Sequence, residues 1–142
     1  PVTSESIIDQ AEDGREAALG LLTAAAIGYT GQDTPAGCLL ATSAISCSEA
    51  ANDVKQELAA IRRSIEARLL DKVKESVRDG HLPRDTDSEA LAGLTMAVIQ
   101  GMSTLARDGA PRDKLLRMVD AAMLAWPDRT YATSRDSCEG QN

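Results

Sequence analysis

A long apolar stripe between Asn52 and Asp79 is the feature that most constrains the fold. Seven aliphatic side chains recur there at intervals of three or four residues: Val54, Leu58, Ile61, Ile65, Leu69, Val73 and Val77. The remaining positions are mostly charged or polar, with pairs such as Arg62/Glu66 at helical spacing. Asp53 and Gln56 suit a capping box at the start, and Gly80 and Pro83 suit the end. The stretch is therefore predicted to be one long helix that buries a single face.

Four further helices are predicted from the same period and from turn residues. They cover about Ser6–Thr30 (with a candidate break at Asp13-Gly14), Cys38–Ser46, Thr86–Arg107 and Pro111–Trp126. Val, Ile and Thr never alternate over a run, and aromatic residues make up only 2% of the chain. The fold class is therefore predicted to be all-α, a helical bundle of five to six helices in one domain over residues 1–127. Residues 128–142 are polar and aperiodic, and are predicted to form a flexible tail.

The distribution of charge argues against nucleic-acid binding by this chain. The formal net charge is −7, and the first 50 residues contain one basic side chain, Arg15, against seven acidic ones. Such a surface repels phosphate. The chain shows neither a signal peptide nor an apolar run of membrane-spanning length, so a cytoplasmic protein is expected.

The sequence lacks the parts from which common catalytic sites are built. Its single histidine, His81, falls in a loop, and its three cysteines have neither C-x-x-C spacing nor a nearby histidine. No glycine-rich loop follows a strand. We therefore expect a non-catalytic protein without a metal site or a cofactor.

The last two helices form a candidate two-fold interface. Gly93, Ala97 and Gly101 lie four residues apart beside the apolar stripe of their helix, and glycine inside a helix costs about 1 kcal/mol relative to alanine. Close approach of another helix would offset that cost, and two such helices with their copies would form a dimeric four-helix bundle. The alternative is that both helices only complete the core of one chain. The predicted interface comprises Gly93, Ala97, Gly101, Leu105, Leu115, Val119, Ala122 and Met123.

Apolar segments with a few inward polar groups suggest a small-molecule pocket. A ligand cavity usually combines an apolar lining with a small number of hydrogen-bonding groups. The alternative is that groups such as Thr95, Ser103 and Thr104 bond to backbone carbonyls one turn back. The predicted ligand-binding residues are Leu22, Ala25, Tyr29, Cys38, Thr42, Ile61, Ile65, Met96, Ile99, Gln100 and Ser103.

Three motifs in order resemble the TetR family of bacterial transcriptional regulators. The first is P-x-G-C-L-L at residues 35–40, and the second is the junction G-x-L-P-x-x-x-D-x-E-A-L-A, similar to residues 80–92. The third is Gln100-Gly101 followed by LARDGA at residues 105–110. The resemblance covers roughly residues 35 to 127 and is that of the C-terminal, ligand-binding domain.

The resemblance implies an Ω-shaped homodimer with an effector pocket inside each subunit. In such proteins an unknown small-molecule effector shifts the helices that carry the DNA-binding heads and releases operator DNA. The family reads DNA through an N-terminal helix-turn-helix of about 50 residues, which nothing in this chain matches. DNA binding is therefore expected of a parent protein and not of this chain. The alternative function is a dimeric helical interaction module without a ligand.

Overall fold

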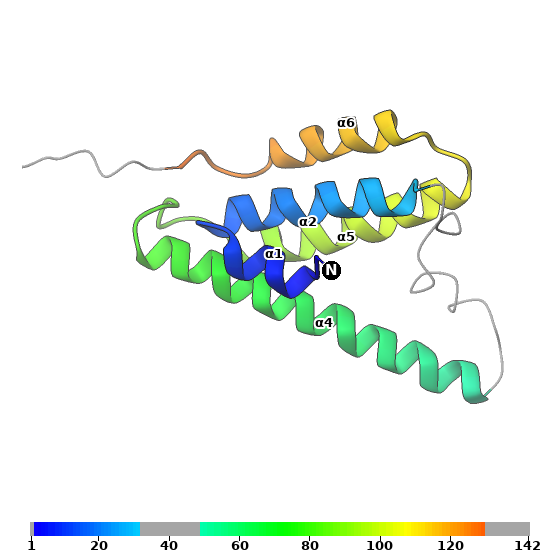
Figure 1. Cartoon of the computed structure of the whole chain (residues 1–142). Coiled ribbons are helices and arrows are strands. Elements are labelled where there is room, and N and C mark those ends of the chain that lie inside the picture. The colour runs from blue at the N-terminus through cyan, green and yellow to red at the C-terminus, as the bar shows by residue number, and fades with distance from the viewer. Residues whose placement is uncertain (1, 32–48, 130–142) are drawn as a thin grey trace, which may run out of the picture.

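The computed structural model describes residues 2–31 and 49–129, and within them the chain is all-α (Figure 1). The described residues form five helices and no strand: α1 (Ser4–Gln10), α2 (Gly14–Tyr29), α4 (Glu49–Arg78), α5 (Ser88–Arg107) and α6 (Arg112–Met123). The predicted fold class is confirmed. The predicted helix Cys38–Ser46 lies outside the described residues.

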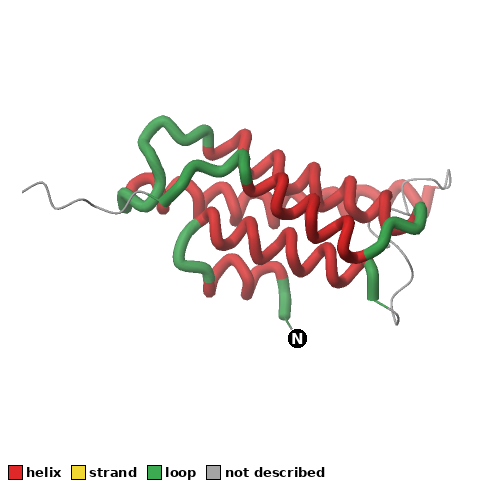
Figure 2. The backbone as a smooth tube through the Cα atoms, turned by 90° about the horizontal axis from the view of Figure 1, so that it is seen from above, coloured by secondary structure: helices red, strands yellow, loops and turns green. Residues whose placement is uncertain are grey.

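Helix α2 lies at the centre of the bundle and packs against every other described helix. The colour ramp in Figure 1 shows that α2 and α5 run in the same direction, whereas α4 and α6 run the opposite way. Seen from above, the helices lie alongside one another and most of the connecting loops gather at the two ends of the bundle (Figure 2). The central position of α2 explains its composition, because a helix covered on several sides must be apolar on more than one face.

The candidate break at Asp13-Gly14 is confirmed. Ala11 is extended after α1, and Asp13 caps α2 by accepting a hydrogen bond on Oδ1 from the Glu16 N–H at 2.8 Å. Gly14 then packs directly on α4, since a Cβ there would lie 2.6 Å from Cγ2 and 2.7 Å from Cα of Val73. Only glycine fits this contact without a shift of the α4 backbone.

Several helix boundaries differ from the prediction. Helix α4 begins at Glu49, three residues before the predicted start, so Asp53 lies inside the helix and not at its cap. Alanine and glutamate are strong helix formers, which lets the helix extend over this stretch. Asp87 caps α5 through Oδ1 and the Ala90 N–H at 3.0 Å, whereas the Thr86 hydroxyl donates to the Pro83 carbonyl at 2.6 Å.

The ends of the later helices follow their turn residues. Gly80 and Gly109 have φ values of 80° and 94°, as expected of glycines that end a helix in the left-handed region. Helix α6 ends at Met123, and the predicted continuation to Trp126 forms tighter turns. There the N–H groups of residues 124 to 126 bond to carbonyls three residues back.

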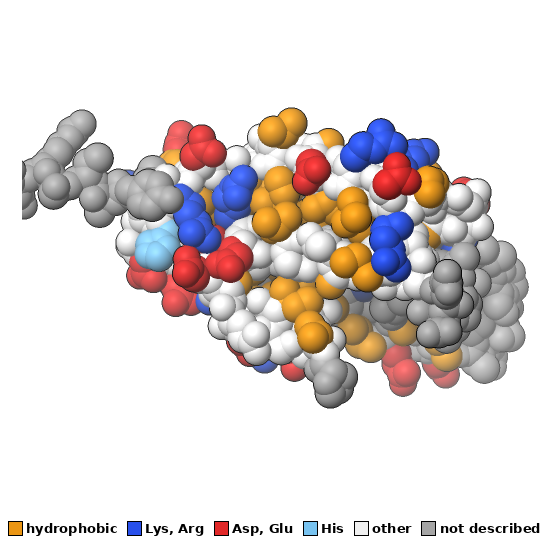
Figure 3. Space-filling view, turned by 45° about the horizontal axis from the view of Figure 1, so that its top comes forward, with side chains coloured by type: hydrophobic (Ala, Val, Ile, Leu, Met, Phe, Trp, Pro, Cys, Tyr) orange, Lys and Arg blue, Asp and Glu red, His pale blue; other side chains and the backbone are white. Residues whose placement is uncertain are grey.

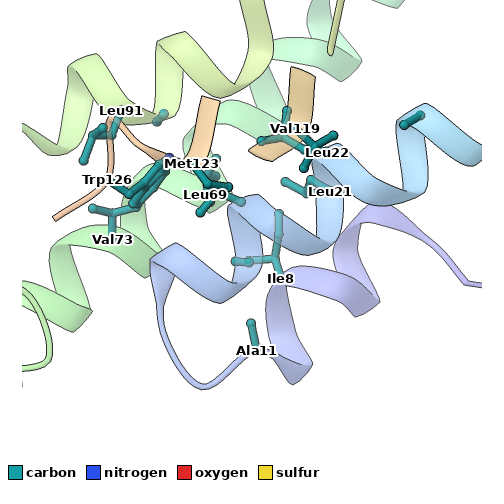
Figure 4. Close-up of a cluster of buried hydrophobic side chains, with 14 of the residues drawn as sticks. Ile8, Ala11, Leu21, Leu22, Leu69, Val73, Leu91, Val119, Met123 and Trp126 are labelled. Atoms are coloured by element: carbon teal, nitrogen blue, oxygen red, sulfur yellow. The ribbon is translucent and has the colours of Figure 1, made fainter. Parts of the chain in front are cut away.

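One hydrophobic core joins all five helices. Leu22, Leu69, Met102, Leu115 and Val119 are among its fully buried side chains. Trp126, which follows α6, closes one end of the core among Val73, Leu69 and Leu91 (Figure 4). The single tryptophan therefore anchors the chain after its last described helix.

Each end of α2 is bound by a different arginine from the C-terminal part of the chain. At its start, Arg129 contacts Asp13 at 2.6 Å, Glu12 at 3.1 Å and Glu16 at 3.4 Å. At its end, Arg112 of α6 donates to the Thr30 hydroxyl at 3.0 Å and to the Ile27 carbonyl at 3.3 Å. Carboxylates at a helix start and a cation at its last carbonyls both favour the helix dipole. The domain boundary at residue 127 stays a prediction, and the Arg129 contacts lie two residues beyond it.

No helix among the described residues is long and apolar enough to cross a membrane.

Candidate ligand-binding site

A cavity of about 220 Å³ lies between α1, α2, α4 and α5. For comparison, an engineered apolar cavity of about 150 Å³ holds benzene. The lining residues are Val2, Ser4, Ile7, Leu21, Ala24, Ala25, Tyr29, Arg62, Ile65, Met96, Ile99, Gln100 and Ser103.

Helix α2 supplies one wall through a regular series. Leu21, Ala25 and Tyr29 follow one another at intervals of four residues, so they lie on one side of the helix. Alanine at the middle position leaves the space that a larger side chain would fill. Tyr29, the last residue of α2, brings a phenol hydroxyl to the wall.

Helix α1 closes the cavity at the start of the chain. Ile7 lines it together with Ser4 and with Val2, which precedes the helix. Helix α1 comes close to α2 because residue 20 is glycine: a Cβ there would lie 2.7 Å from Cγ2 of Ile7. The first described residues of the chain are thus part of the cavity wall.

The lining is largely aliphatic, with polar groups from all four helices. Neutral hydrogen-bonding groups come from Ser4, Tyr29, Gln100 and Ser103. Among the described lining residues, Arg62 of α4 is the only charged one, and it is half-buried. An arginine side chain stays positively charged at any ordinary pH. The described wall of the cavity therefore combines an apolar surface with a few polar side chains, as small-molecule sites commonly do.

The structure brings seven of the predicted ligand-binding residues to this cavity. These are Ala25, Tyr29, Ile65, Met96, Ile99, Gln100 and Ser103. Ligand binding by them stays a prediction.

Two other predicted ligand-binding residues lie elsewhere. Leu22 is fully buried in the core, and Ile61 is 49% exposed on the outside of α4. Each is adjacent in sequence to a residue that does line the cavity, Leu21 or Arg62. A shift of one residue turns a side chain by about 100° around a helix. Cys38 and Thr42 lie outside the described residues.

Two polar side chains of α5, Thr95 and Thr104, bond to the backbone as the alternative interpretation predicts. The Thr95 hydroxyl is buried and donates to the Leu91 carbonyl at 2.8 Å, one turn back. The Thr104 hydroxyl is directed in the same way to the Gln100 carbonyl at 3.4 Å. Ser103 and Gln100 line the cavity. Hydrogen bonding to the backbone thus accounts for the two threonines.

Sequence reasoning missed six lining residues, and one of them could have been found. Leu21 lies four residues before Ala25, so extending the Ala25–Tyr29 spacing backwards reaches it. Ala24 and Arg62 give no such signal, because both suit an outer helix face equally well. Val2, Ser4 and Ile7 belong to a short first helix whose contact with the cavity depends on the turn at Asp13.

The residues predicted for the dimer interface lie on two different sides of the structure. Ala97 and Gly101 are exposed on α5, and Gly93, Leu105 and Ala122 are half-buried. The other three, Leu115, Val119 and Met123, are buried in the core of this chain. Their face of α6 packs on α2, so it is unavailable to a second copy while the bundle is intact.

The described residues contain no cluster of three or more His, Cys, Asp or Glu side chains that could hold a metal ion.

Comparison with known proteins decides the family. Residues 16–126 match the family model of the tetracyclin repressor-like C-terminal domain. The chain belongs to the TetR family. The match covers the helices α2, α4, α5 and α6, that is, the central helix and three of the four that pack around it.

Relatives of this TetR-family domain are transcriptional regulators. The chain is 30% identical over 100 residues to the HTH-type transcriptional repressor ComR of Escherichia coli (strain K12), which covers 70% of this chain and 48% of ComR. A cysteine mutant of the TetR family regulator CifR, solved with a 26-bp operator DNA, has a TM-score of 0.79 at 31% identity over 87% of this chain. A putative TetR regulator from Rhodococcus sp. RHA1 has a TM-score of 0.75 at 30% identity over 88% of this chain. The TetR domain described here spans about half of ComR and 65–66% of the two solved chains.

Proposed function

We propose that this chain is the effector-binding and dimerisation domain of a TetR-type transcriptional repressor, and that it is not an enzyme. The observation that supports this most directly is the cavity, which is walled by four helices and lined mainly by aliphatic side chains. A pocket of this kind suits a small molecule. A repressor of bacterial genes would act in the cytoplasm, where its operator is.

The position of α1 suggests how ligand binding in the cavity would alter the affinity for operator DNA. In this proposal a DNA-binding head would precede α1, as the family resemblance implies, and the relative solved with operator DNA supports such an arrangement. A ligand in the cavity would contact Val2, Ser4 and Ile7, and so would change the angle at which α1 leaves the bundle. The ligand shifts operator affinity only if it prefers one of the two arrangements.

The exposed side of α5 is the proposed contact with a second copy. Leu94 is 40% exposed, and Ala97 and Gly101 lie further along the same side of the helix. A Cβ at Gly101 would meet no described atom within 4 Å, so packing among the described residues does not explain that glycine. Hydrophobic side chains also gather on the outer surface over α6 and α2 (Figure 3). We therefore narrow the proposed interface to α5 and the outer face of α6.

A thermal-shift screen tests the effector pocket. An effector at 100 times its Kd stabilises the folded state by about 2.7 kcal/mol, which raises Tm by several degrees. The variant Ala25→Phe fills the cavity from its central wall position, and Ala67→Leu is the matched control on the exposed side of α4. We expect an effector to raise the Tm of the wild type and of Ala67→Leu, but not that of Ala25→Phe.

Two results would contradict this proposal. A screen in which no compound shifts Tm would favour the alternative, a dimeric interaction module without a ligand. Shifts that persist in Ala25→Phe would place the binding site elsewhere on the molecule.

A further inference from the structure

We propose that α1 opens away from the cavity as a unit by rotation at residues 11–13, and that this opening requires Arg129 to dissociate from the side chains beside it. Residues 11–13, which join α1 to α2, are called the hinge below. The inference goes beyond the proposed function, because the movement needs no ligand and is tested without one.

Helix α1 forms a wall of the cavity but is a small element. It has seven residues, too few for a stable helix on its own in water. Ile8 is its only buried side chain and belongs to the common core (Figure 4). Its ion pair to α4 joins Asp9 to Arg68 at 3.6 Å, and both side chains are well exposed, so this pair contributes little. The position of α1 therefore depends on a few apolar contacts and on the hinge that follows it.

The other side of the hinge is attached to α4. The Gly14 N–H donates to Oγ of the buried Ser76 at 2.8 Å. A Cβ at Gly14 would lie 2.7 Å from Cα of Val73, so α2 begins in direct contact with the α4 backbone. Ala11, in contrast, is extended and lies outside both helices. A movement of α1 relative to the bundle would thus occur at the hinge, while the start of α2 stays in place.

Arg129 binds side chains at the hinge and after it. Its Nη1 lies 3.1 Å from Glu12 and its Nε lies 2.6 Å from the fully buried Asp13, both in the hinge. Its Nη2 lies 3.4 Å from Glu16 on α2, whose carboxylate also accepts a hydrogen bond from the Glu12 N–H at 2.8 Å. Rotation at the hinge would separate Glu12 from these partners. The three carboxylates repel one another when their cation is removed, so loss of Arg129 also favours the open hinge.

The chain before Arg129 is fixed in the core, which keeps the guanidinium near the hinge. Trp126 is buried against Val73 and Leu69, three residues before Arg129 (Figure 4). The segment that follows α6 then passes the start of α2 (Figure 1). Because the neighbouring backbone is already ordered by Trp126, Arg129 loses less conformational entropy when it binds the hinge.

Amide hydrogen exchange of the 142-residue chain, followed by NMR, tests the inference. Residues 7–10 report on α1, where the Ile7 N–H bonds to the Thr3 carbonyl at 3.0 Å, and residues 95–103 report on the interior of α5. In the wild type we expect the α1 amides to exchange at least roughly tenfold faster than those of α5, because they exchange through a local opening. Arg129→Met should accelerate the α1 amides by about tenfold, since hydrogen bonds to charged groups are lost. The α5 amides should accelerate by a similar factor, because global unfolding breaks the same contacts.

Three further variants complete the measurement. Arg117→Met removes an exposed pair on α6, and Arg68→Met removes the exposed pair of α1 itself; each should change the α1 rates by less than about twofold. Arg129→Lys keeps a positive charge beside Asp13 and so decides the question if Arg129→Met does not fold. It should accelerate the α1 amides, but less than Arg129→Met does.

Two results would overturn the inference. If the α1 amides of the wild type exchange as slowly as those of α5, then α1 opens only when the whole domain unfolds. If the α1 rates are unchanged in both Arg129 variants, then α1 opens without release of Arg129. A thermal-shift screen without hits would count against the effector pocket and leave these exchange rates as they are, so the two proposals fail separately.

Discussion

Asp13 and Arg129 form the most buried ionic contact described in this protein. The Asp13 side chain is fully buried, with Oδ1 capping α2 and Oδ2 lying 2.6 Å from Nε of Arg129. Burial by itself lowers the pKa of the Arg129 guanidinium, but the attraction of Asp13, Glu12 and Glu16 outweighs it, so the pKa is raised. Because the pKa is raised in the folded state, the contribution of the Arg129 charge is fully present below its pKa in the unfolded chain. It is lost only as the pH rises through the folded-state pKa, far above neutral.

We expect Arg129→Met to destabilise the fold by about 1 to 3 kcal/mol, because it leaves the Asp13 carboxylate buried without its cation. This is less than the loss for a fully buried pair, since the Arg129 side chain is 34% exposed. The double variant Asp13→Asn/Arg129→Met should recover part of the loss, because asparagine also caps helices but carries no charge. Urea unfolding of the wild type, Arg129→Met and the double variant measures these differences in the free energy of unfolding.

The control for this prediction is Arg117→Met. Arg117 pairs with Asp113 at 3.5 Å on the outside of α6, where both side chains are more than 70% exposed. Its loss should change the free energy of unfolding by less than about 0.5 kcal/mol. If Arg117→Met and Arg129→Met lower the free energy of unfolding by the same amount, burial of Asp13 does not strengthen its ion pair with Arg129.

Helix α6 is short and depends on packing against α2 for its stability. It has 12 residues, too few for a stable helix on its own in water. Its apolar residues Leu115, Val119 and Met123 are therefore used against α2 and not against a second copy. Only the outer face remains for an intermolecular contact.

Leu115→Ala is expected to lower the free energy of unfolding by about 2 to 5 kcal/mol, since it removes a fully buried side chain and leaves a cavity. Leu124→Ala, just after α6, is the control: Leu124 is 87% exposed, and its loss should have almost no effect. Chemical unfolding at several protein concentrations distinguishes a role of Leu115 in the core of one chain from a role in the dimer interface. If the loss of unfolding free energy caused by Leu115→Ala disappears at high protein concentration, Leu115 contributes to an interface between two copies and not to the core of one chain.

The whole molecule is proposed to be a dimer of this chain. The proposed contact along α5 contains a glycine with open space around it, and the family resemblance implies a dimer. One chain has a mass of 15.0 kDa, so a dimer has about 30 kDa. Light scattering over a dilution series measures this directly.

We expect the wild type to have a mass of about 30 kDa and Gly101→Leu to shift towards 15.0 kDa on dilution, because a leucine would hold the second copy away from α5. Gly28→Leu on α2 is the matched control. An added Cβ at either glycine meets no described atom within 4 Å, so both positions are open to a side chain, and both variants gain helix propensity of up to about 1 kcal/mol. A monomeric wild type, or a Gly101→Leu dimer as stable as that of Gly28→Leu, would contradict the proposed interface.

Sequence patterns were sufficient to predict the described helices and the family. Local signals were sufficient for this: the period of the apolar residues in α4, the break at Asp13-Gly14 and the glycines after α4 and α5 all act within a few residues of one another. The boundaries that were wrong, at Glu49, Asp87 and Met123, are those where a helix extends or tightens by a few residues without a strong stop signal.

Which side of each helix faces the cavity, the core or the solvent depends on how the helices pack together. Leu21 and Leu22 are the same residue type, yet one lines the cavity and the other lies in the core, because neighbouring positions point about 100° apart. Helix α2 is apolar on several sides, so its sequence pattern does not define its rotation. The contact of α1 with the cavity and the ion pairs of Arg129 with the start of α2 join residues far apart in the sequence. No local pattern encodes such contacts, since they depend on how all the helices pack together.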